Sequence, residues 1–368
     1  MSSQAGSGLR GSWATAWRGR RVLLTGHTGF KGSWMSLWLA GLGARVTGFS
    51  LAPPTEPNLF SLVGAAADVD SVIGDIRDLP ALEAAVARAR PEIIIHMAAQ
   101  SVVRASYTDP LTTYSTNVMG TANLLDVARR CPDVQAILVV TSDKCYENRE
   151  QIWAYREHDR MGGHDPYSNS KGCAELVVAA FRDSYFRKAG VAVATARAGN
   201  VIGGGDWTAD RLVPDAMRAF LARRTLDIRN PIAVRPWQHV LEPLQGYLLL
   251  GARLLGDEAG AYAGGWNFGP GHDSNQPVSD VVDALAACWG GGATWRQVGD
   301  PADLHEATLL HLDSTKANIK LGWTPVHTYK TAVALTVDWF KAYEAGADLR
   351  AITQAQIEAY MNHHPRAA

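Results

Sequence analysis

The chain has 368 residues, with 35 Lys and Arg against 36 Asp and Glu, so its formal net charge is -1. This length predicts two to three domains or one large α/β core with a cap, and the balanced charge excludes nucleic acid and anionic membranes as expected partners. No apolar run approaches the roughly 18 residues of a membrane span, and the four cysteines form no C-x-x-C pair, which argues against a zinc site or a disulfide framework and favours a reducing cytoplasm.

The first 16 residues are rich in Gly and Ser and lack an apolar core, so we expect a flexible leader and no signal peptide. From residue 17 to residue 200, short apolar runs alternate with helical patterns. We expect strands at Arg21–Leu24, Arg45–Phe49, Val69–Ile73, Ile93–Ile95, Ala136–Val140 and Val191–Ala194, and helices at Gly32–Leu42, Leu79–Ala89, Leu111–Arg130 and Ser170–Ala189. This βαβ series predicts an α/β fold with a doubly wound parallel sheet of the Rossmann type.

Beyond residue 200 the pattern is less regular. We expect short strands at Leu226–Ile228 and Ala233–Val234, helices at Val278–Trp289 and Thr331–Tyr343, and a helix over His239–Leu255 followed by a strand at Trp266–Phe268 that returns to the main sheet. The prediction is therefore a dinucleotide-binding domain over 17–200 plus about 238–266, and a smaller, interleaved substrate-binding lobe over about 201–237 and 267–360.

The first expected strand runs directly into a glycine-rich turn and then a helix. Gly26, Gly29 and Gly32 form a G-x-x-G-x-x-G pattern, in which missing side chains let backbone amides and a helix N-terminus approach a pyrophosphate. The position after the first strand favours a dinucleotide site over a merely structural tight turn. The candidate cofactor-binding residues are Gly26, Thr28, Gly29, Phe30, Lys31, Gly32, Asp75, Ile76, Ala98, Ala99, Gln100, Asn117, Tyr167 and Lys171.

The choice between NAD and NADP is normally made at the end of the second strand, where an acidic residue binds the ribose hydroxyls. The sequence reads Gly48-Phe49-Ser50-Leu51 there, without a carboxylate, and His27 and Lys31 in the glycine turn leave room for a phosphate. We expect NAD as the cofactor, with NADP as the alternative. His96, at the end of the fourth strand, is expected to be a hydrogen-bonded core histidine.

Two further motifs carry candidate catalytic groups. Ser142-Asp143-Lys144 follows the fifth strand, at the edge where open α/β sheets bind their ligands. Tyr167 and Lys171 stand four residues apart at the start of a helix, on one face. The ammonium of Lys171 is expected to favour the phenolate of Tyr167, so that the tyrosine accepts a proton from an alcohol.

These residues carry a family resemblance that runs from about residue 17 to about residue 360. The chain resembles the extended short-chain dehydrogenase/reductase superfamily and, within it, the CDP-glucose 4,6-dehydratase family. The segments that carry the resemblance are Gly26-His27-Thr28-Gly29-Phe30-Lys31-Gly32-Ser33-Trp34, Thr141-Ser142-Asp143-Lys144-Cys145-Tyr146-Glu147-Asn148, Asp165-Pro166-Tyr167-Ser168-Asn169-Ser170-Lys171, Asn200-Val201-Ile202-Gly203-Gly204-Gly205-Asp206-Trp207 and Arg235-Pro236-Trp237-Gln238-His239-Val240.

The resemblance implies a lyase that converts CDP-D-glucose to CDP-4-keto-6-deoxy-D-glucose and water, with NAD+ regenerated in each turnover, in deoxysugar biosynthesis of the lipopolysaccharide O-antigen type. Tyr167 would take the proton of the 4-hydroxyl, Ser142 would bind that oxygen and Lys171 would orient the cofactor ribose. Asp143 and Lys144 would supply the acid and the base for loss of water. As a base, Lys144 must be neutral part of the time, which burial beside Lys171 favours.

The resemblance also implies which residues bind the substrate and how the chain assembles. Candidate substrate-binding residues are Arg104, Asn200, Arg211, Arg235 and Asn267, the arginines being suited to a diphosphate; an ordinary surface arginine is the alternative for Arg211 and Arg235. The helices at Leu111–Arg130 and Ser170–Ala189 resemble the pair that forms the family's four-helix-bundle homodimer, and a tetramer stays open. His305-Glu306 also resembles a family segment, without an assigned role.

Two rival functions remain. A nucleotide-sugar 4-epimerase, or another 4,6-dehydratase, would share Ser142, Tyr167 and Lys171, and an epimerase would not need an acid–base pair at Asp143 and Lys144. A non-catalytic dinucleotide sensor would keep the glycine turn and lose the tyrosine. The nucleotide base rests on resemblance alone.

Overall fold

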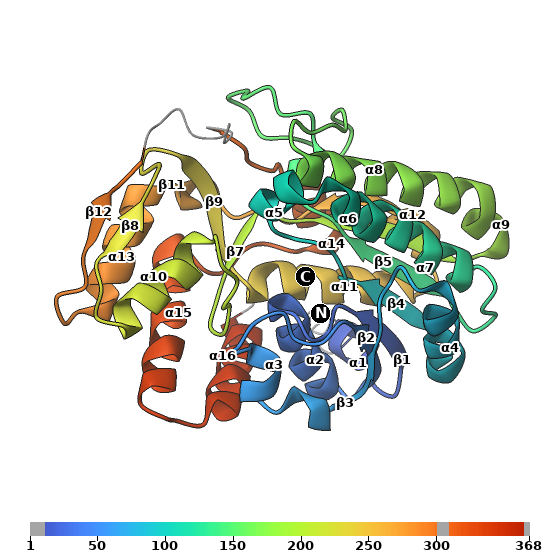
Figure 1. The fold of residues 1–368 in the computed structure, drawn as a ribbon. Helices are drawn as coiled ribbons and strands as arrows, with labels where there is room; N and C mark the ends of the chain where they lie inside the picture. Colours follow the sequence, from blue (N-terminus) through green and yellow to red (C-terminus); the bar gives the residue numbers. More distant parts are fainter. Residues whose placement is uncertain (1–11, 300–308, 364–368) are drawn as a thin grey trace, which may run out of the picture.

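The structure is a computed structural model that describes residues 12–299 and 309–363. A large part built on a parallel sheet lies beside a smaller part that contains several short strands and helices (Figure 1). The segments of the two parts alternate along the chain, and the cavity described below lies where they meet. His305 and Glu306 fall outside the described residues.

The large sheet contains seven parallel strands in the order β10-β6-β5-β4-β1-β2-β3. They are β1 (Arg21–Thr25), β2 (Arg45–Ser50), β3 (Val69–Ile73), β4 (Ile93–His96), β5 (Ala136–Val140), β6 (Ala192–Arg197) and β10 (Gly264–Asn267). The strand order reverses between β1 and β4, which creates a crevice at the carboxyl ends of these strands. The predicted doubly wound fold is confirmed, as is the return of the chain to this sheet near Trp266.

Both faces of the sheet are buried, and β1 shows this most directly. Val22 and Leu24 belong to one apolar cluster, whereas Leu23 between them belongs to another. The first cluster includes side chains of α2 (Phe30–Gly41), α11 (Leu241–Leu254) and α16 (Leu349–His363), and the second includes side chains of α4 (Leu79–Ala89), α7 (Gly120–Ala128) and α8 (Pro166–Phe181). Helices on both faces explain why these strands are continuous apolar runs.

Two helices that the sequence predicts as continuous are interrupted by wide π-helical turns. The first runs through α6 (Pro110–Tyr114), a π segment (Ser115–Met119) and α7, and the second through α8, a π segment (Arg182–Phe186) and α9 (Arg187–Ala189). In the first π segment, the Asn117 side chain donates to the carbonyl of Gln100 at 3.0 Å. Such turns commonly occur near functional sites.

The smaller part contains a three-stranded and a two-stranded sheet. Their strands are β7 (Asn200–Ile202), β9 (Val234–His239), β11 (Asn275–Pro277), β8 (Leu226–Ile228) and β12 (Trp295–Gln297), and the accompanying helices are α10 (Leu212–Leu221), α13 (Val278–Trp289) and α15 (Tyr329–Glu344). The remaining helices are α1 (Ser12–Thr15), α3 (Leu59–Leu62), α5 (Val103–Thr108), α12 (Ala259–Tyr262) and α14 (Thr315–Leu321). The sequence predicts β8 and α13 with their observed bounds and misses β7, α10 and α16.

Tryptophans and glycines pack together where the two parts meet. Trp34 on α2 donates its indole N–H to the carbonyl of Gly204 at 3.0 Å. A Cβ atom on Gly204 would lie 2.0 Å from the ring of Trp339 on α15. Trp207 packs edge-on against Phe340, with ring centroids 5.0 Å apart. The glycine run therefore serves close packing of large aromatic rings.

The two ends of the described chain differ from the sequence prediction. The predicted leader is too long, because residues 12–15 form α1 and Trp13 packs against the large core. At the other end, α16 packs on α2, with the Trp38 and Tyr360 rings 5.9 Å apart, so this helix crosses the predicted division into domains. Within the described residues, no helix is long and apolar enough to span a membrane.

Candidate active site

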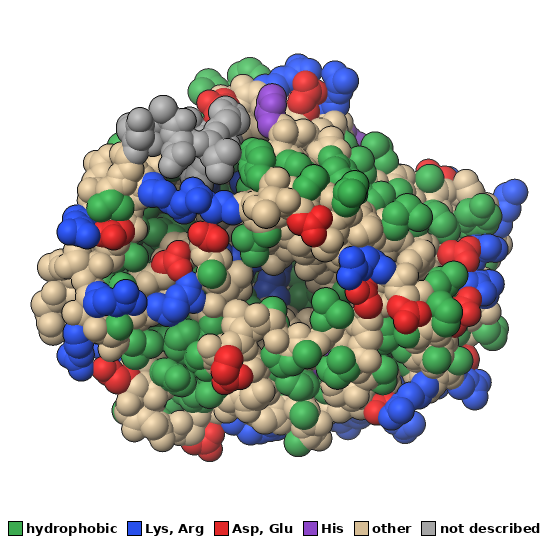
Figure 2. Space-filling model, in the orientation of Figure 1, with side chains coloured by type: hydrophobic (Ala, Val, Ile, Leu, Met, Phe, Trp, Pro, Cys, Tyr) green, Lys and Arg blue, Asp and Glu red, His purple; other side chains and the backbone are tan. Residues whose placement is uncertain are grey.

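A cavity of about 950 Å³ lies at the carboxyl ends of the central strands, between the large and the small part. Figure 2 shows this face hollowed near its middle, with lysine or arginine atoms visible inside the hollow. The cavity is lined by the glycine turn after β1, the ends of β4 and β5, the start of α8, and residues of β7, β9 and α10. The sequence motifs singled out above thus meet around one space.

The glycine turn has the geometry of a pyrophosphate cradle. Gly26 has a φ of +77°, and a Cβ atom on it would lie 2.8 Å from the amide nitrogen of Ala98. A Cβ atom on Gly32 would lie 2.0 Å from the carbonyl oxygen of Gly26. Gly29 is the N-cap of α2, and no side chain caps the first turn of this helix. Its backbone amides are therefore available to an anion in the cavity, as a dinucleotide requires.

The far end of this groove fits an adenosine. Thr28 donates its hydroxyl to the carbonyl of Leu51 at 2.8 Å, which fixes the loop after β2 against the glycine turn. Asp75, Ile76 and Leu51 line the cavity here. Asp75 is ion-paired with Arg77 at 2.6 Å, and this partner holds the pKa of the Asp75 carboxyl below its usual value.

His27 and Lys31 do not provide the phosphate pocket that their positions in the turn suggest. His27 is fully buried outside the cavity lining, and burial lowers its pKa to about 4, so the ring is neutral near pH 7. Lys31 lines the cavity, but burial and then the charges of Lys171 and Arg211 lower its pKa to about 7. Its Nζ donates to Tyr247 Oη at 3.1 Å. His27 and Lys31 therefore do not form a fully charged cation pair for the 2′-phosphate of NADP.

The turn after β5 presents the first catalytic candidates. Ser142 is the N-cap of a short 3-10 turn (Asp143–Cys145), and its Oγ accepts the amide N–H of Lys144 at 3.2 Å. Ser142 also donates to Asp143 Oδ1 at 2.9 Å. Asp143 is buried, which raises the pKa of its carboxyl and favours the protonated form. A carboxylic acid and an amine are thereby placed side by side at the cavity wall.

Tyr167 and Lys171 enter the cavity from the first turns of α8. This helix starts at the Asp165 cap, which accepts the Ser168 amide at 2.9 Å, and Pro166 follows the cap. Lys171 Nζ lies 6.0 Å from the centre of the Tyr167 ring. Helix capping thus fixes where the tyrosine hydroxyl meets the turn after β5.

Burial, and not a charged neighbour, is the main influence on the pKa of Tyr167 in the structure. Burial raises the pKa of Tyr167 to about 12, opposed chiefly by its hydrogen bond with Ser142. Burial lowers the pKa of Lys171 to about 8. Desolvation dominates because both groups are enclosed, so the phenol is protonated until other charges enter the site.

A buried ion pair supports the turn after β5 from the protein interior. Sequence reasoning missed this pair. Glu175 and Arg197 are each about 5 % exposed or less, and Arg197 Nη2 donates to Glu175 Oε2 at 2.8 Å. The same carboxylate accepts the hydroxyls of Thr141 at 2.5 Å and Thr195 at 2.7 Å. The spacing of Glu175, one helical turn after Lys171 on the buried face of α8, is the signal that would have found it.

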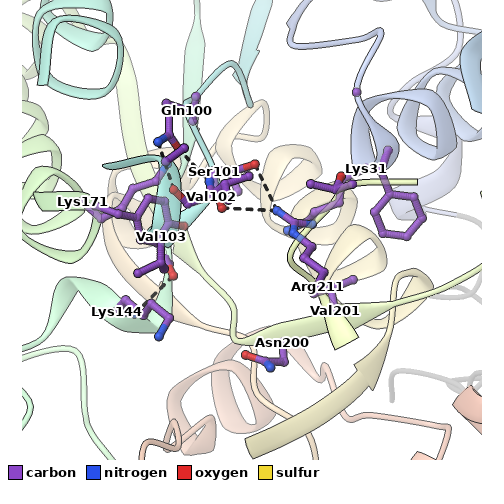
Figure 3. Close-up of a pocket in the computed structure, with 18 of the residues that line it drawn as sticks. Lys31, Gln100, Ser101, Val102, Val103, Lys144, Lys171, Asn200, Val201 and Arg211 are labelled. Carbon is purple, nitrogen blue, oxygen red and sulfur yellow. Dashed lines mark hydrogen bonds between the residues drawn. The ribbon is translucent and has the colours of Figure 1, made fainter. Parts of the chain in front are cut away.

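Both parts of the molecule contribute the expected substrate-binding side chains. Arg104, Asn200, Arg211 and Arg235 all line the cavity. Arg211 reaches across it and donates to Ser101 Oγ at 3.0 Å, while its other nitrogen contacts Asp206 at 3.3 Å. In Figure 3, Arg211 and Lys31 lie on one side of the cavity and Lys144 and Lys171 on the other. The surface-arginine alternative therefore fails for Arg211 and Arg235.

Two predicted contact residues do not reach the cavity, although the other candidates line it. Asn267, predicted to touch substrate, is fully buried and donates to the carbonyls of Tyr155 at 2.9 Å and Asp313 at 3.1 Å. Asn117, predicted to touch the cofactor, is buried behind Gln100, whose backbone amide it accepts at 2.8 Å. Both side chains position neighbouring segments, because their polar atoms are used within the protein.

His96 is the core histidine that the sequence predicts. Its Nδ1 lies 2.7 Å from Thr25 Oγ1, and its Nε2 lies 3.1 Å from Thr121 Oγ1. Burial lowers its pKa to about 3, so the ring is neutral. With both nitrogens engaged, this ring supports β1 and β4 and takes no part in proton transfer.

Comparison with known proteins places the whole chain among nucleotide-sugar enzymes. A family model described as GDP-mannose 4,6 dehydratase matches residues 23–255. A CDP-glucose 4,6-dehydratase from Salmonella typhimurium is 50% identical over 351 residues, which cover 94% of this chain and 97% of the relative. A dTDP-glucose 4,6-dehydratase from Streptomyces antibioticus is 30% identical, with 87% of this chain and 92% of the relative covered.

Solved structures agree with the fold. A dTDP-glucose 4,6-dehydratase from Streptomyces venezuelae, solved with NAD bound, has a TM-score of 0.74 at 26% identity and covers 89% of this chain and 99% of that one. A UDP-glucose 4-epimerase from Thermotoga maritima, solved with UDP-glucose, also has a TM-score of 0.74, at 22% identity, and covers 88% of this chain and 99% of that one. The epimerase match supports the fold alone.

Proposed function

The chain belongs to the nucleotide-sugar 4,6-dehydratase family of extended short-chain dehydrogenases/reductases, and from this premise we propose that it converts CDP-D-glucose to CDP-4-keto-6-deoxy-D-glucose and water. The observation that carries the proposal is the meeting of Tyr167 and Lys171 with the Asp143–Lys144 pair around one cavity. The identity of half its residues to the Salmonella enzyme supports the cytidine nucleotide.

NAD is the cofactor of this enzyme. The cradle of Gly26, Gly29 and Gly32 and the uncapped start of α2 suit its pyrophosphate. When bound, NAD+ would supply the hydride acceptor for the oxidation of carbon 4 and, in its reduced form, the hydride donor for carbon 6. The neutral His27 and the low pKa of Lys31 favour NAD over NADP. Lys171, which lines the cavity, would hydrogen-bond and orient the nicotinamide ribose.

The side chains first move the proton of the 4-hydroxyl. Tyr167 accepts it, and Ser142 holds the same oxygen by a hydrogen bond as it becomes a carbonyl. Because burial raises the pKa of Tyr167 to about 12, proton acceptance requires positive charge near the phenol, and Lys171, whose Nζ lies 6.0 Å from the ring centre, is placed to supply it.

The resulting 4-ketone acidifies the hydrogen on carbon 5, and the pair after β5 then acts. Lys144 removes that proton, and Asp143, whose pKa is raised by burial, protonates the departing 6-hydroxyl as water forms. The two reacting carbons are adjacent, as are the two side chains. Lys144 returns a proton to carbon 5 when the double bond is reduced.

The diphosphate of the substrate binds at the small part. Arg235 on β9 and Arg211 at the start of α10 supply guanidinium groups for bidentate hydrogen bonds, and Arg104 on α5 faces them from the large part. Asn200 on β7 also lines the cavity, where it would contact the sugar phosphate. The Arg211–Ser101 hydrogen bond must open as the phosphates enter.

A 4-epimerase is the main rival on this fold. It would use Ser142, Tyr167 and Lys171 and would leave the acid and base at 143 and 144 without a task. The buried, protonation-prone Asp143 beside Lys144 at the cavity wall favours elimination of water instead.

We also infer a homodimer formed through a four-helix bundle. Large apolar side chains on two neighbouring helical segments are exposed, which is unusual for a surface that stays in water. They are Leu111 (81% exposed), Met119 (57%), Leu176 (61%) and Tyr185 (48%). Sedimentation of Leu176→Arg tests this: a monomer at concentrations where the wild type is dimeric supports it, and an unchanged mass rejects it.

We further propose a cytoplasmic enzyme of deoxysugar biosynthesis of the O-antigen type. Four free cysteines, among them the buried Cys145, suit a reducing compartment. The 4-keto-6-deoxy product is an activated intermediate on which later reductases or transaminases act, as the 4-ketone requires.

A panel of nucleotide sugars tests the assignment. Purified protein with NAD+ is offered CDP-, dTDP-, UDP- and GDP-hexoses, and mass spectrometry follows the loss of one water. Preferential turnover of CDP-glucose supports the proposal. Preferential turnover of dTDP-glucose would reject the cytidine assignment and leave the chemistry intact, and a product isomeric with its substrate would indicate an epimerase.

A further inference from the structure

Gly199 lies at the cavity wall between β6 and β7, with its Cα facing the Asp143 carboxylate. A Cβ atom built on it would lie 2.8 Å from Asp143 Oδ2 and 3.0 Å from Cγ of Pro236. Contacts below 3.0 Å between such atoms are repulsive, so a side chain here would force a neighbour to move. The backbone of Gly199 is not left-handed, so alanine fits its conformation and the conflict is purely steric.

The neighbours differ in how readily they move. Pro236 is buried in β9, where its strand pairs with β11 opposite Asn275. The backbone of Asp143 is fixed, because its amide donates to the carbonyl of Ala198 at 3.1 Å. Only the Asp143 carboxylate, held by the Ser142 hydroxyl at 2.9 Å, can turn away. The group displaced by a methyl at 199 would thus be the acid of the elimination step.

We propose that Gly199 is a positioning residue for the elimination step: its missing side chain leaves the space in which the Asp143 carboxylate lies beside Lys144. The inference rests on the proposed function, in which Asp143 protonates the 6-hydroxyl. Oxidation at carbon 4 depends on Tyr167 and Ser142 and on the cofactor cradle, none of which a Cβ at 199 would touch within 3.5 Å. A substitution at Gly199 should therefore slow the loss of water without slowing the oxidation at carbon 4.

The test is Gly199→Ala with CDP-glucose and NAD+, with the reaction quenched and analysed by mass spectrometry. Since a displacement of about 1 Å in a catalytic group costs about a hundredfold in rate, we expect kcat for water loss to fall by about that factor. The 4-keto sugar that still carries its 6-hydroxyl, two hydrogens lighter than substrate, should accumulate on the enzyme. Gly41→Ala is the matched control, because no atom lies within 4 Å of its Cβ position.

A double-mutant cycle separates a positioning role from general damage. Asp143→Ala removes the carboxylate that Gly199 accommodates, so adding Gly199→Ala to it should lower water loss no further. Should Gly199→Ala fold poorly, the double variant should recover the melting temperature of Asp143→Ala. Additive losses, a failure of the double variant to recover folding, or oxidation slowed as much as water loss would overturn the inference. If the wild type does not dehydrate CDP-glucose, it is the proposed function that fails.

Discussion

Arg197 Nη2 donates to Glu175 Oε2 at 2.8 Å directly beneath the catalytic turn, and the same carboxylate accepts the hydroxyl of Thr141, the residue before Ser142. The pair connects α8, which carries Tyr167 and Lys171, to β5 and β6. Because both charges are buried, each depends on the other for compensation. The ion pair thereby helps to hold the two catalytic motifs in their relative position.

Glu175→Gln should destabilise the fold by about 3 kcal/mol, because it leaves the Arg197 charge buried without a counter-ion. Denaturant unfolding followed by circular dichroism measures this. Asp70→Asn is the control, since it breaks the exposed Arg88–Asp70 pair and should leave the midpoint unchanged. Equal effects of the two substitutions would mean that the buried pair is not an anchor.

Tyr167→Phe should abolish oxidation at carbon 4, because phenylalanine has no hydroxyl to accept the 4-hydroxyl proton beside Ser142. Quenched reaction mixtures should contain only CDP-glucose, with its binding affinity little changed. Tyr185→Phe, on the exposed continuation of α8, should react at the wild-type rate. Appearance of the 4-keto sugar with Tyr167→Phe would remove Tyr167 from the role of base.

Asp143→Asn should still oxidise carbon 4 but stall before water loss, because an amide does not protonate the 6-hydroxyl. Lys144→Met should also stall and, in D2O, should no longer exchange the hydrogen at carbon 5. Nuclear magnetic resonance of the recovered sugar distinguishes the two variants. Dehydration by Asp143→Asn at the wild-type rate, or rapid exchange with Lys144→Met, would contradict the respective role.

Glu242 on α11 predicts a pH dependence of stability. Its carboxylate accepts the His327 amide at 2.7 Å and the Tyr360 hydroxyl at 2.7 Å, and burial raises its pKa from 4.5 to about 7. A raised folded-state pKa means that the folded protein binds the proton more tightly than the unfolded chain. Stability should therefore fall as the pH rises from about 4.5 to about 7, and stay lower above that.

Glu242→Gln should remove this slope and raise the melting temperature at pH 8 relative to the wild type, because glutamine can accept the His327 amide through Oε1 and donate its own amide to Tyr360 Oη without burying a charge. Thermal unfolding at pH 5 and pH 8 measures both effects. Glu358→Gln, on the exposed face of α16, is the control and should preserve the wild-type slope. An unaltered slope in Glu242→Gln would exclude Glu242 as its source.

The sequence predicts those features that depend on local pattern. The apolar runs at Val69–Ile73 and Ala136–Val140 give their strands with the observed bounds, and the motifs that follow strand ends give the catalytic residues. Features that depend on distant neighbours were missed. Asn267 lies in the predicted strand at Trp266–Phe268, yet its side chain is enclosed by Tyr155 and Asp313, which no local pattern reveals.

The pKa values in the site also depend on distant neighbours and not on local sequence pattern. Spacing places Lys171 one turn after Tyr167, but the pKa of the tyrosine is governed by enclosure from several segments, which raises it to about 12. Likewise, the need for a glycine at position 199 comes from the close approach of Asp143 and Pro236, which are far from it in the chain. Burial is a property of the assembled fold. Residue types therefore predict which groups react, whereas packing determines the pKa values of those groups.

The most direct test of the central claim uses CDP-glucose carrying deuterium at carbon 4. An internal oxidation, elimination and reduction should give a product that has lost one water and carries that deuterium at carbon 6, with no net consumption of NAD+. Mass spectrometry and nuclear magnetic resonance read both features in one sample. A product that retains its water, or that carries no deuterium at carbon 6, would contradict the account.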